Sequence, residues 1–219
     1  MKISEAARDA GVTVPTFKYY LREGLVSPGT RLTGNQTAYA TTHVQRVRLV
    51  RALIETGGLS IETAKSVLAT LDSDETTLAH TFEAAQHALA GKSPGSAPPT
   101  PESLRAIAEL ASDQGWRSAG GNPGTDVAAR VLDGLAAIDF HPSAEYLDAY
   151  ATAASLIARA DLGALGSRDR PDLVAELMVV GTVLGDVLLA GLRRLAQESV
   201  TSEFFPGAES SDQKARDIT

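Results

Sequence analysis

Residues 4–24, SEAARDAGVTVPTFKYYLREG, contain the start and stop signals of two short helices close together along the chain. Ser4 is a favourable N-cap, and Gly11 suits the left-handed residue that ends a first helix. Thr13 can cap a second helix, which Gly24 ends. Two short helices joined by so tight a turn are typical of a helix-turn-helix. We expect these helices to pack through Ala7, Val12, Phe17 and Tyr20.

The second helix, residues 13–23, is rich in aromatic and cationic side chains for its length. In a helix-turn-helix this helix enters the major groove of DNA with its N-terminal residues nearest the bases. Cationic and hydroxyl groups there can bind phosphates or reach base edges. The alternative is a solvated helix that carries a few cations by chance. The candidate DNA contacts are Thr13, Thr16, Lys18, Tyr19, Arg22 and, in the following loop, Arg31.

The charge of the chain is unevenly distributed. Residues 1–71 carry nine Lys or Arg and five Asp or Glu, a balance of +4. The remaining residues have a balance of -11, which gives the net charge of -7. Such asymmetry predicts that the first third of the chain contacts a polyanion and that the rest does not.

Residues 27–40, SPGTRLTGNQTAYA, have the glycine, proline and asparagine content of a turn or a short hairpin. An apolar stripe over residues 44–54 then predicts a helix that begins near Thr42 and ends at the glycine pair 57–58. Ser60 can cap the helix after it. The apolar side of that helix is formed by Ile61, Ala64, Val67, Leu68 and Leu71.

A dimerisation helix and a linker are expected next. Leu78, Phe82, Ala85 and Leu89 recur at steps of four, three and four, which gives a narrow apolar seam suited to pairing with another helix. Residues 91–101, GKSPGSAPPTP, have the composition of a linker. The predicted organisation is a DNA-binding domain at 1–71, a dimerisation helix at 72–90, a linker at 91–101, a helical effector-binding or dimerisation domain at 102–206 and a disordered tail at 207–219.

The helical domain completes a fold class that is mainly α, with a C-terminal all-α helical bundle. Aromatic residues are only 5% of the chain, which favours helix packing over a sheet sandwich. The last helix is apolar nearly all round in its middle, so it is either central in a bundle or buried in a subunit contact. Its segment 177–192 is too short to cross a bilayer, and Gly181 and Gly185 would let a neighbour approach closely. The expected helices cover residues 102–116, 125–140, 143–165 and 171–205.

The run KISEAARDAGVTVPTFKYYLREGLVSP, a loop ending at Tyr39 and the helical pair VQRVRLVRALIETGGLSIETAKSVL together resemble the DNA-binding domain of the MerR family of transcriptional regulators. The resemblance covers residues 1–71 and implies a winged helix-turn-helix that dimerises through the helix after it. It places Lys18 where the family usually has a phosphate-binding arginine, and it matches Tyr19, Tyr20 and Tyr39 to family tyrosines. Arg46, on the helix after the wing, completes the candidate set.

Two stretches depart from the family pattern. The wing often carries a Gly-Tyr-Arg run, whereas this chain has Asn35, Gln36 and Thr37. Leu21 replaces the acidic residue that usually follows the tyrosine pair.

The resemblance also implies a mechanism and partners. MerR-like regulators commonly bind promoters whose two polymerase elements are spaced too far apart, and they distort the duplex so that RNA polymerase can use both. An effector biases two protein conformations through its unequal affinity for them. The implied partners are double-stranded promoter DNA, a second copy of the chain, RNA polymerase and a small organic ligand.

The effector would bind in the second part of the chain. Metal sensors of this family use cysteines, and this chain has none. His80, Glu83 and His87 are more simply a polar flank of the dimerisation helix than metal ligands, so no metal or cofactor is predicted. Asp186 and Glu176, on the apolar last helix, would need partners if buried. The candidate effector residues are Trp116, Phe140, His141, Tyr146, Tyr150 and Glu176, with ordinary core or interface positions as the alternative.

No nucleophile, phosphate loop or paired acid and base stands out, so a binding function is predicted rather than an enzyme. The chain does not open with a charged and then apolar leader, and we expect it to be cytoplasmic. The sequence predicts a homodimeric, ligand-responsive transcription factor. The alternatives are a repressor whose helical bundle only dimerises and a small helical enzyme with a degenerate helix-turn-helix.

Overall fold

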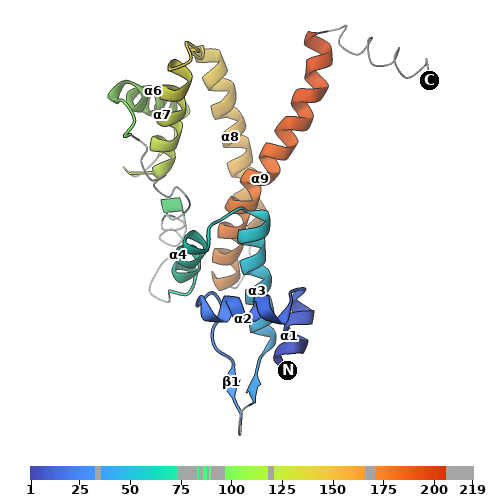
Figure 1. Cartoon of the computed structure of the whole chain (residues 1–219). Coiled ribbons are helices and arrows are strands. Elements are labelled where there is room, and N and C mark those ends of the chain that lie inside the picture. The colour runs from blue at the N-terminus through green and yellow to red at the C-terminus, as the bar shows by residue number, and fades with distance from the viewer. Residues whose placement is uncertain are drawn as a thin grey trace, which may run out of the picture.

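The chain folds into an N-terminal helical domain with a two-stranded wing and a second part made of longer helices (Figure 1). One of the longer helices connects the two parts. The structure, a computed structural model, describes residues 1–32, 36–73, 83, 86–87, 89, 97–117, 121–165 and 171–205, and only the backbone of residues 171–173, 175 and 202. The predicted fold class is confirmed. The predicted seam residues Leu78, Phe82 and Ala85 and the tail at 207–219 lie outside the described residues.

The predicted helix-turn-helix is formed by α1 (Ile3–Ala10) and α2 (Val14–Arg22). Gly11 ends α1 in the left-handed region at a φ of 71°, where glycine avoids the strain of a β-carbon. Thr13 caps α2, because its hydroxyl oxygen accepts the backbone N–H of Thr16 at 3.2 Å. Both boundaries confirm the sequence prediction.

The predicted cap of the first helix is wrong. α1 begins at Ile3, one residue before Ser4, and Lys2 is its N-cap. The backbone N–H of Lys2 donates to the Glu5 carboxylate at 2.7 Å, so an acidic side chain in the first turn supplies the acceptor. The two helices meet as predicted, with Ala7, Phe17 and Tyr20 buried and Val12 half-buried.

The wing is a short antiparallel pair, β1 (Thr30–Arg31) and β2 (Thr37–Ala38). α3 (Thr41–Arg51) follows the wing and continues without a break into a π-helical segment, η1 (Ala52–Thr56). α4 (Ile61–Leu71) begins after the predicted cap, since the Ser60 hydroxyl accepts the backbone N–H of Thr63 at 3.0 Å. The π-helical segment was not predicted.

Four helices form the second part of the described chain: α6 (Pro101–Asp113), α7 (Pro123–Ala136), α8 (Ala144–Leu165) and α9 (Pro171–Phe204). α6 packs on α7, and α8 packs against α9. Figure 1 shows the C-terminal half of α9 diverging from the other helices, so the described helices do not close into a bundle. None of the described helices is both long enough and apolar enough to span a membrane.

The N-terminal half of α9 belongs to the core of the helix-turn-helix domain. Val179 and Val183 are buried in the same cluster as Phe17, Leu53 and Val67. α9 also contacts η1 and α4 directly. α9 is therefore central over only part of its length. A central position was one of the two alternatives that the sequence left open, the other being a subunit contact.

The side chain of Asp133 in α7 ties down the start of α6. It accepts the backbone N–H and the hydroxyl of Thr100 at 2.9 and 2.6 Å, and the hydroxyl of Ser103 at 2.6 Å. These bonds, the Ser103 bond foremost, hold the pKa of Asp133 below its usual value.

Asp133→Asn should therefore lower the melting temperature by a few degrees at neutral pH. Because the folded-state pKa is depressed, the carboxylate stabilises the fold above the unfolded pKa, about 3.9 for aspartate, and loses that effect as the pH falls through the folded value. Melting curves of the wild type and the variant should converge in acid, whereas Glu109→Gln, at an exposed position of α6, should leave the melting curve unchanged. A difference that persists at the lowest pH would contradict this role.

Candidate nucleic-acid interface and effector site

The exposed face of α2 carries two cationic groups, one unpaired within the described chain and one in a long ion pair. Lys18 is exposed and makes no hydrogen bond or ion pair with any residue the structure describes. The side chain of Arg22 is 72% exposed, with its guanidinium 5.2 Å from the centre of the Tyr19 ring and a long contact of 3.7 Å to Glu23. A half-buried Tyr19 thus orients Arg22, while Lys18 is free to meet an anion.

Thr13 and Thr16 lie together at the N-terminus of α2. Their hydroxyl oxygens are 2.8 Å apart, and Thr13 also accepts the Thr16 backbone N–H. Both hydroxyls therefore serve the cap and stay close to solvent, at the end of the helix where the macrodipole favours an anion.

Two of the predicted tyrosines are structural in the free chain. Tyr20 is 5% exposed and Tyr39 is 8% exposed. The Tyr39 ring packs edge-on against Phe17, with centroids 5.2 Å apart, and burial raises the pKa of Tyr20. Tyr39 therefore packs the end of the wing against α2, and Tyr20 is part of the core.

The arginines of α3 are engaged within the domain. Arg46 donates to the Leu25 carbonyl at 3.0 Å and forms a paired contact with the Asp72 carboxylate. Arg48 donates to the carbonyl of Asp9 at 2.6 Å, and Arg51 donates to that of Gly11 at 3.0 Å. Arg46 is therefore held by partners within the domain, unlike Lys18. Its partners are distant in sequence, so no local signal predicted them.

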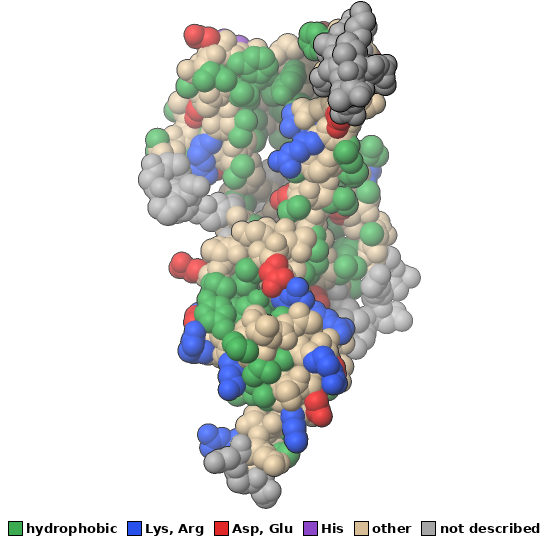
Figure 2. Space-filling view, turned by 45° about the vertical axis from the view of Figure 1, so that its right-hand side comes forward, with side chains coloured by type: hydrophobic (Ala, Val, Ile, Leu, Met, Phe, Trp, Pro, Cys, Tyr) green, Lys and Arg blue, Asp and Glu red, His purple; other side chains and the backbone are tan. Residues whose placement is uncertain are grey.

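The wing adds one cation beyond α2. Arg31, at the end of β1, is exposed and has no ion pair among the described residues. Figure 2 shows Lys and Arg side chains around the lower part of the molecule, including the wing, while green apolar side chains line the helices above. The cations of α2 and of the wing are thus on separate elements of one domain, as contact with a polyanion requires.

The predicted aromatic residues do not form an enclosed pocket. Phe140, Tyr146 and Tyr150 make a row on the surface, with Tyr146 donating its hydroxyl to Tyr150 at 3.1 Å. That bond lowers the pKa of Tyr150, and Arg193 of α9 donates to the same oxygen at 2.6 Å. This row joins α8 to α9. Trp116, 42% exposed, donates to the Ser155 hydroxyl, and His141 and Glu176 are exposed.

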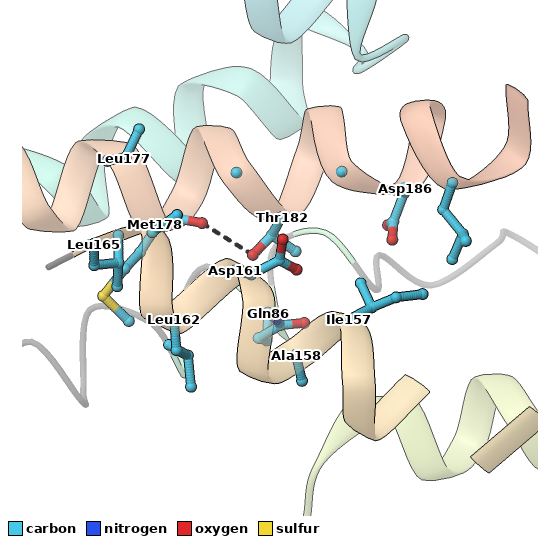
Figure 3. A pocket seen from close by; sticks show the side chains of 14 residues that line it. Gln86, Ile157, Ala158, Asp161, Leu162, Leu165, Leu177, Met178, Thr182 and Asp186 are labelled. Carbon is cyan, nitrogen blue, oxygen red and sulfur yellow. Dashed lines mark hydrogen bonds between the residues drawn. The ribbon is translucent and has the colours of Figure 1, made fainter. Parts of the chain in front are cut away.

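A cavity of about 350 Å³ lies instead between α8 and α9 (Figure 3). Its walls are mostly apolar, and Gln86 also lines it. The side chains of Asp161 and Asp186, both exposed, point into the space between the two helices. A β-carbon at Gly181 or Gly185 would meet nothing within 4 Å, so these glycines leave the space open within one chain. The apolar lining comes chiefly from Ile157, Leu162, Leu165, Leu177, Met178 and Leu189.

One helix thus presents two functional faces. Met178 and Asp186 line the cavity, whereas Val179 and Val183 are buried against the DNA-binding domain. A β-carbon at Gly57 would collide with Cγ1 of Val183, so the chain after η1 and α9 approach as closely as only glycine allows. This close contact is a direct packing connection between α9 and the end of η1.

No metal site is evident in the described part of the chain, where no three His, Cys, Asp or Glu residues are grouped to hold an ion. Glu83 and His87 are exposed, and His80 lies outside the described residues. That His80, Glu83 and His87 form a polar flank of the dimerisation helix therefore remains a prediction.

Residues 1–71 match the family model described as MerR HTH family regulatory protein. The chain is 40% identical over 50 residues to the HTH-type transcriptional regulator ZntR homolog of Haemophilus influenzae, covering 23% of this chain and 37% of that protein. It is 35% identical over 69 residues to heavy metal-dependent transcription regulator 2 of Rhizobium meliloti, covering 32% and 46%. The chain therefore spans less than half the length of either curated relative in these matches.

A solved structure is similar over nearly the whole chain. It is that of SCO5550 from Streptomyces coelicolor A3(2), described as a candidate transcriptional regulator, with a TM-score of 0.71 and 29% identity. The likeness covers 94% of this chain and 98% of that one, so it includes the helices after the helix-turn-helix.

Proposed function

We propose, from the premise that residues 1–71 form a helix-turn-helix domain of the MerR family, that this chain regulates transcription as a homodimer. The domain binds promoter DNA and distorts it for RNA polymerase, and a small organic effector held by α8 and α9 controls the distortion. The observation that carries the proposal is the exposed cationic face of α2, with Lys18 unpaired among the described residues and Arg22 only loosely paired, on a domain of this family. Binding, and no catalysis, is the proposed activity.

We assign the DNA contacts to exposed side chains that are not held tightly within the domain. Lys18, Arg22 and Arg31 bind phosphates, since each is exposed. Thr13 and Thr16 lie at the N-terminus of α2, which in this class of domain faces the groove. Tyr19 orients Arg22. Arg46 contributes indirectly, because it stabilises the fold of the domain. A mobility-shift titration with the chain's own promoter fragment tests the assignment: binding should weaken steeply with salt, and absence of binding in dilute buffer would overturn it.

A second copy is the partner proposed for the C-terminal half of α9. Leu188, Leu192 and Leu195 are 63%, 54% and 65% exposed at steps of four and three, which is the spacing of a helix-pairing seam. Contiguous apolar surface of this kind marks an interaction site in soluble proteins. Of the predicted seam at 78–89, only Leu89 is described, and it packs against the core of the DNA-binding domain.

Leu192→Glu combined with Leu195→Glu should dissociate the dimer. Two charges in a paired seam leave uncompensated groups at an apolar contact, and we expect the dimer dissociation constant to rise by about a hundredfold or more. Sedimentation over a concentration series measures it, with Ile138→Glu, at a 72% exposed position, as the matched control. A wild-type chain that sediments as a monomer at micromolar concentration would overturn the homodimer.

The cavity favours a ligand-responsive regulator over a repressor whose bundle only dimerises. A space of about 350 Å³ with a mostly apolar lining and a few polar groups is the usual form of a small-molecule site. Contact of α9 with both the cavity and η1 supports coupling to the DNA-binding domain. A thermal-shift screen with hydrophobic and cationic compounds distinguishes the two, because an effector raises the melting temperature by mass action.

A further inference from the structure

The wing is too small to hold its own direction. Its strands β1 and β2 have two residues each, and an isolated two-stranded hairpin is marginally stable in water. Figure 1 shows the wing projecting from the end of the molecule that carries α1 and α2. Arg31, which is exposed on this wing, therefore takes a fixed position only if the two ends of the wing are held where they join the domain.

His43, in the first turn of α3, contacts both ends of the wing. Its Nδ1 accepts the backbone N–H of Ala40, just after β2, at 3.1 Å. Because Nδ1 accepts, the proton of the neutral imidazole is on Nε2, which donates to the carbonyl of Pro28, just before β1, over a longer 3.4 Å. The half-buried ring also packs edge-on against Tyr39, with centroids 5.5 Å apart. One side chain thus joins the entry and the exit of the wing.

The backbone at the base of the wing is closely packed. A β-carbon at Gly29 would lie 2.6 Å from the carbonyl oxygen of Ala38 and 2.9 Å from a ring carbon of Tyr39. Only glycine lets the chain that enters the wing pass this close to the chain that leaves it. The Tyr39 ring packs in turn on Phe17 of α2. The base of the wing therefore contacts the helix that carries Lys18, and His43 holds it from the side of α3.

We infer that His43 is a positioning residue for DNA binding: it fixes the direction of the wing and thereby places Arg31 against a phosphate. The inference rests on the proposed function, in which Arg31 is a DNA contact. His43→Phe keeps a ring against Tyr39 and removes both hydrogen bonds. His43→Gln keeps an amide oxygen that accepts the Ala40 N–H, as in a capping box, and an amide N–H that can donate to Pro28.

Double-mutant cycles separate this role from a general loss of stability. His43→Phe and Arg31→Ala should each weaken binding to the chain's own promoter fragment by up to about tenfold, the scale of one charge-assisted contact. The double variant should bind no more weakly than Arg31→Ala alone, because both changes remove the same contact. His43→Phe with Lys18→Ala, which removes a contact on α2, should instead show the product of the two losses. His43→Gln should bind nearly as tightly as the wild type.

Hydrogen exchange of the wing gives a measurement that needs no DNA. The backbone N–H of Leu32 donates to the carbonyl of Gln36 across the wing at 2.9 Å. In the full chain carrying His43→Phe it should exchange about fivefold faster, the scale of one lost hydrogen bond, while the amides of α4 should exchange as in the wild type.

Four results would each overturn the inference: losses that multiply in the cycle with Arg31, coupling of equal size with Lys18, unchanged exchange of the Leu32 amide, or a loss in His43→Gln as large as in His43→Phe. All titrations are made well below the melting temperatures, so that each variant is folded. A wild-type chain that does not bind the promoter refutes the proposed function and with it the role of Arg31. Wild-type binding with independent losses at His43 and Arg31 refutes the role of His43 alone.

Discussion

Replacing both Lys18 and Arg22 with alanine is expected to weaken promoter binding by about a hundredfold, since two charge-assisted contacts contribute roughly 1.5 kcal/mol each. Both side chains are exposed on the same short helix, and neither has a strong partner within the described chain. Losing phosphate contacts should also reduce the salt dependence, by about 0.9 in the slope of log K against log salt for each contact. Mobility-shift titrations at several salt concentrations measure both quantities.

The matched control removes two cations from the other part of the molecule. Arg105→Ala with Arg117→Ala changes exposed residues of α6 and of the segment just after it, and should leave both affinity and salt slope unchanged. Circular dichroism should show that neither double variant has lost helix, because the altered side chains are not in the core. Equal weakening by the two pairs would mean that overall charge, and not the face of α2, determines DNA binding.

Local signals in the sequence were sufficient for most helix boundaries. Thr13 and Ser60 cap the helices they were expected to cap, because a cap depends on a side chain and a backbone group only three residues apart. The prediction that Ser4 caps the first helix was wrong for a reason that is also local. The Glu5 carboxylate, in the first turn, accepts the backbone N–H of Lys2 instead. The four helices after residue 100 also lie close to their predicted ranges.

Features that depend on distant partners could not be predicted. Arg46 looked like a free cation, yet its partners Leu25 and Asp72 lie 21 and 26 residues away in sequence. The cavity depends on the spacing between α8 and α9. Gly181 and Gly185 suggested a close approach of another element, whereas within one chain they border an open space. Aromatic content likewise pointed to a pocket where the structure has a surface row.

The coupling between the two parts of the chain leads to the second large expected effect. Val179→Asp should place a charge on α9 where the valine is 0% exposed against the DNA-binding domain. An unpaired buried charge costs about 3–5 kcal/mol, which corresponds to a decrease of roughly 10 °C in melting temperature for a chain of this size. Val179 shares its core with Phe17 and Leu53, so promoter affinity is measured well below the lowered melting temperature. There the helix-turn-helix should still be folded, and promoter affinity of the ligand-free chain should change much less.

Val179→Asp should abolish the effect of an effector on promoter affinity, whereas it should weaken promoter binding itself much less. If α9 carries the signal from the cavity to η1, an effector found in the thermal-shift screen should no longer change promoter affinity once Val179→Asp has separated the two surfaces, although calorimetry should still detect its binding. Val131→Asp makes the same change at a 55% exposed position of α7 and should leave melting temperature and response intact. A full effector response in the Val179 variant would show that the signal reaches the DNA-binding domain by a route other than this face of α9, because the contact with η1 would then be dispensable.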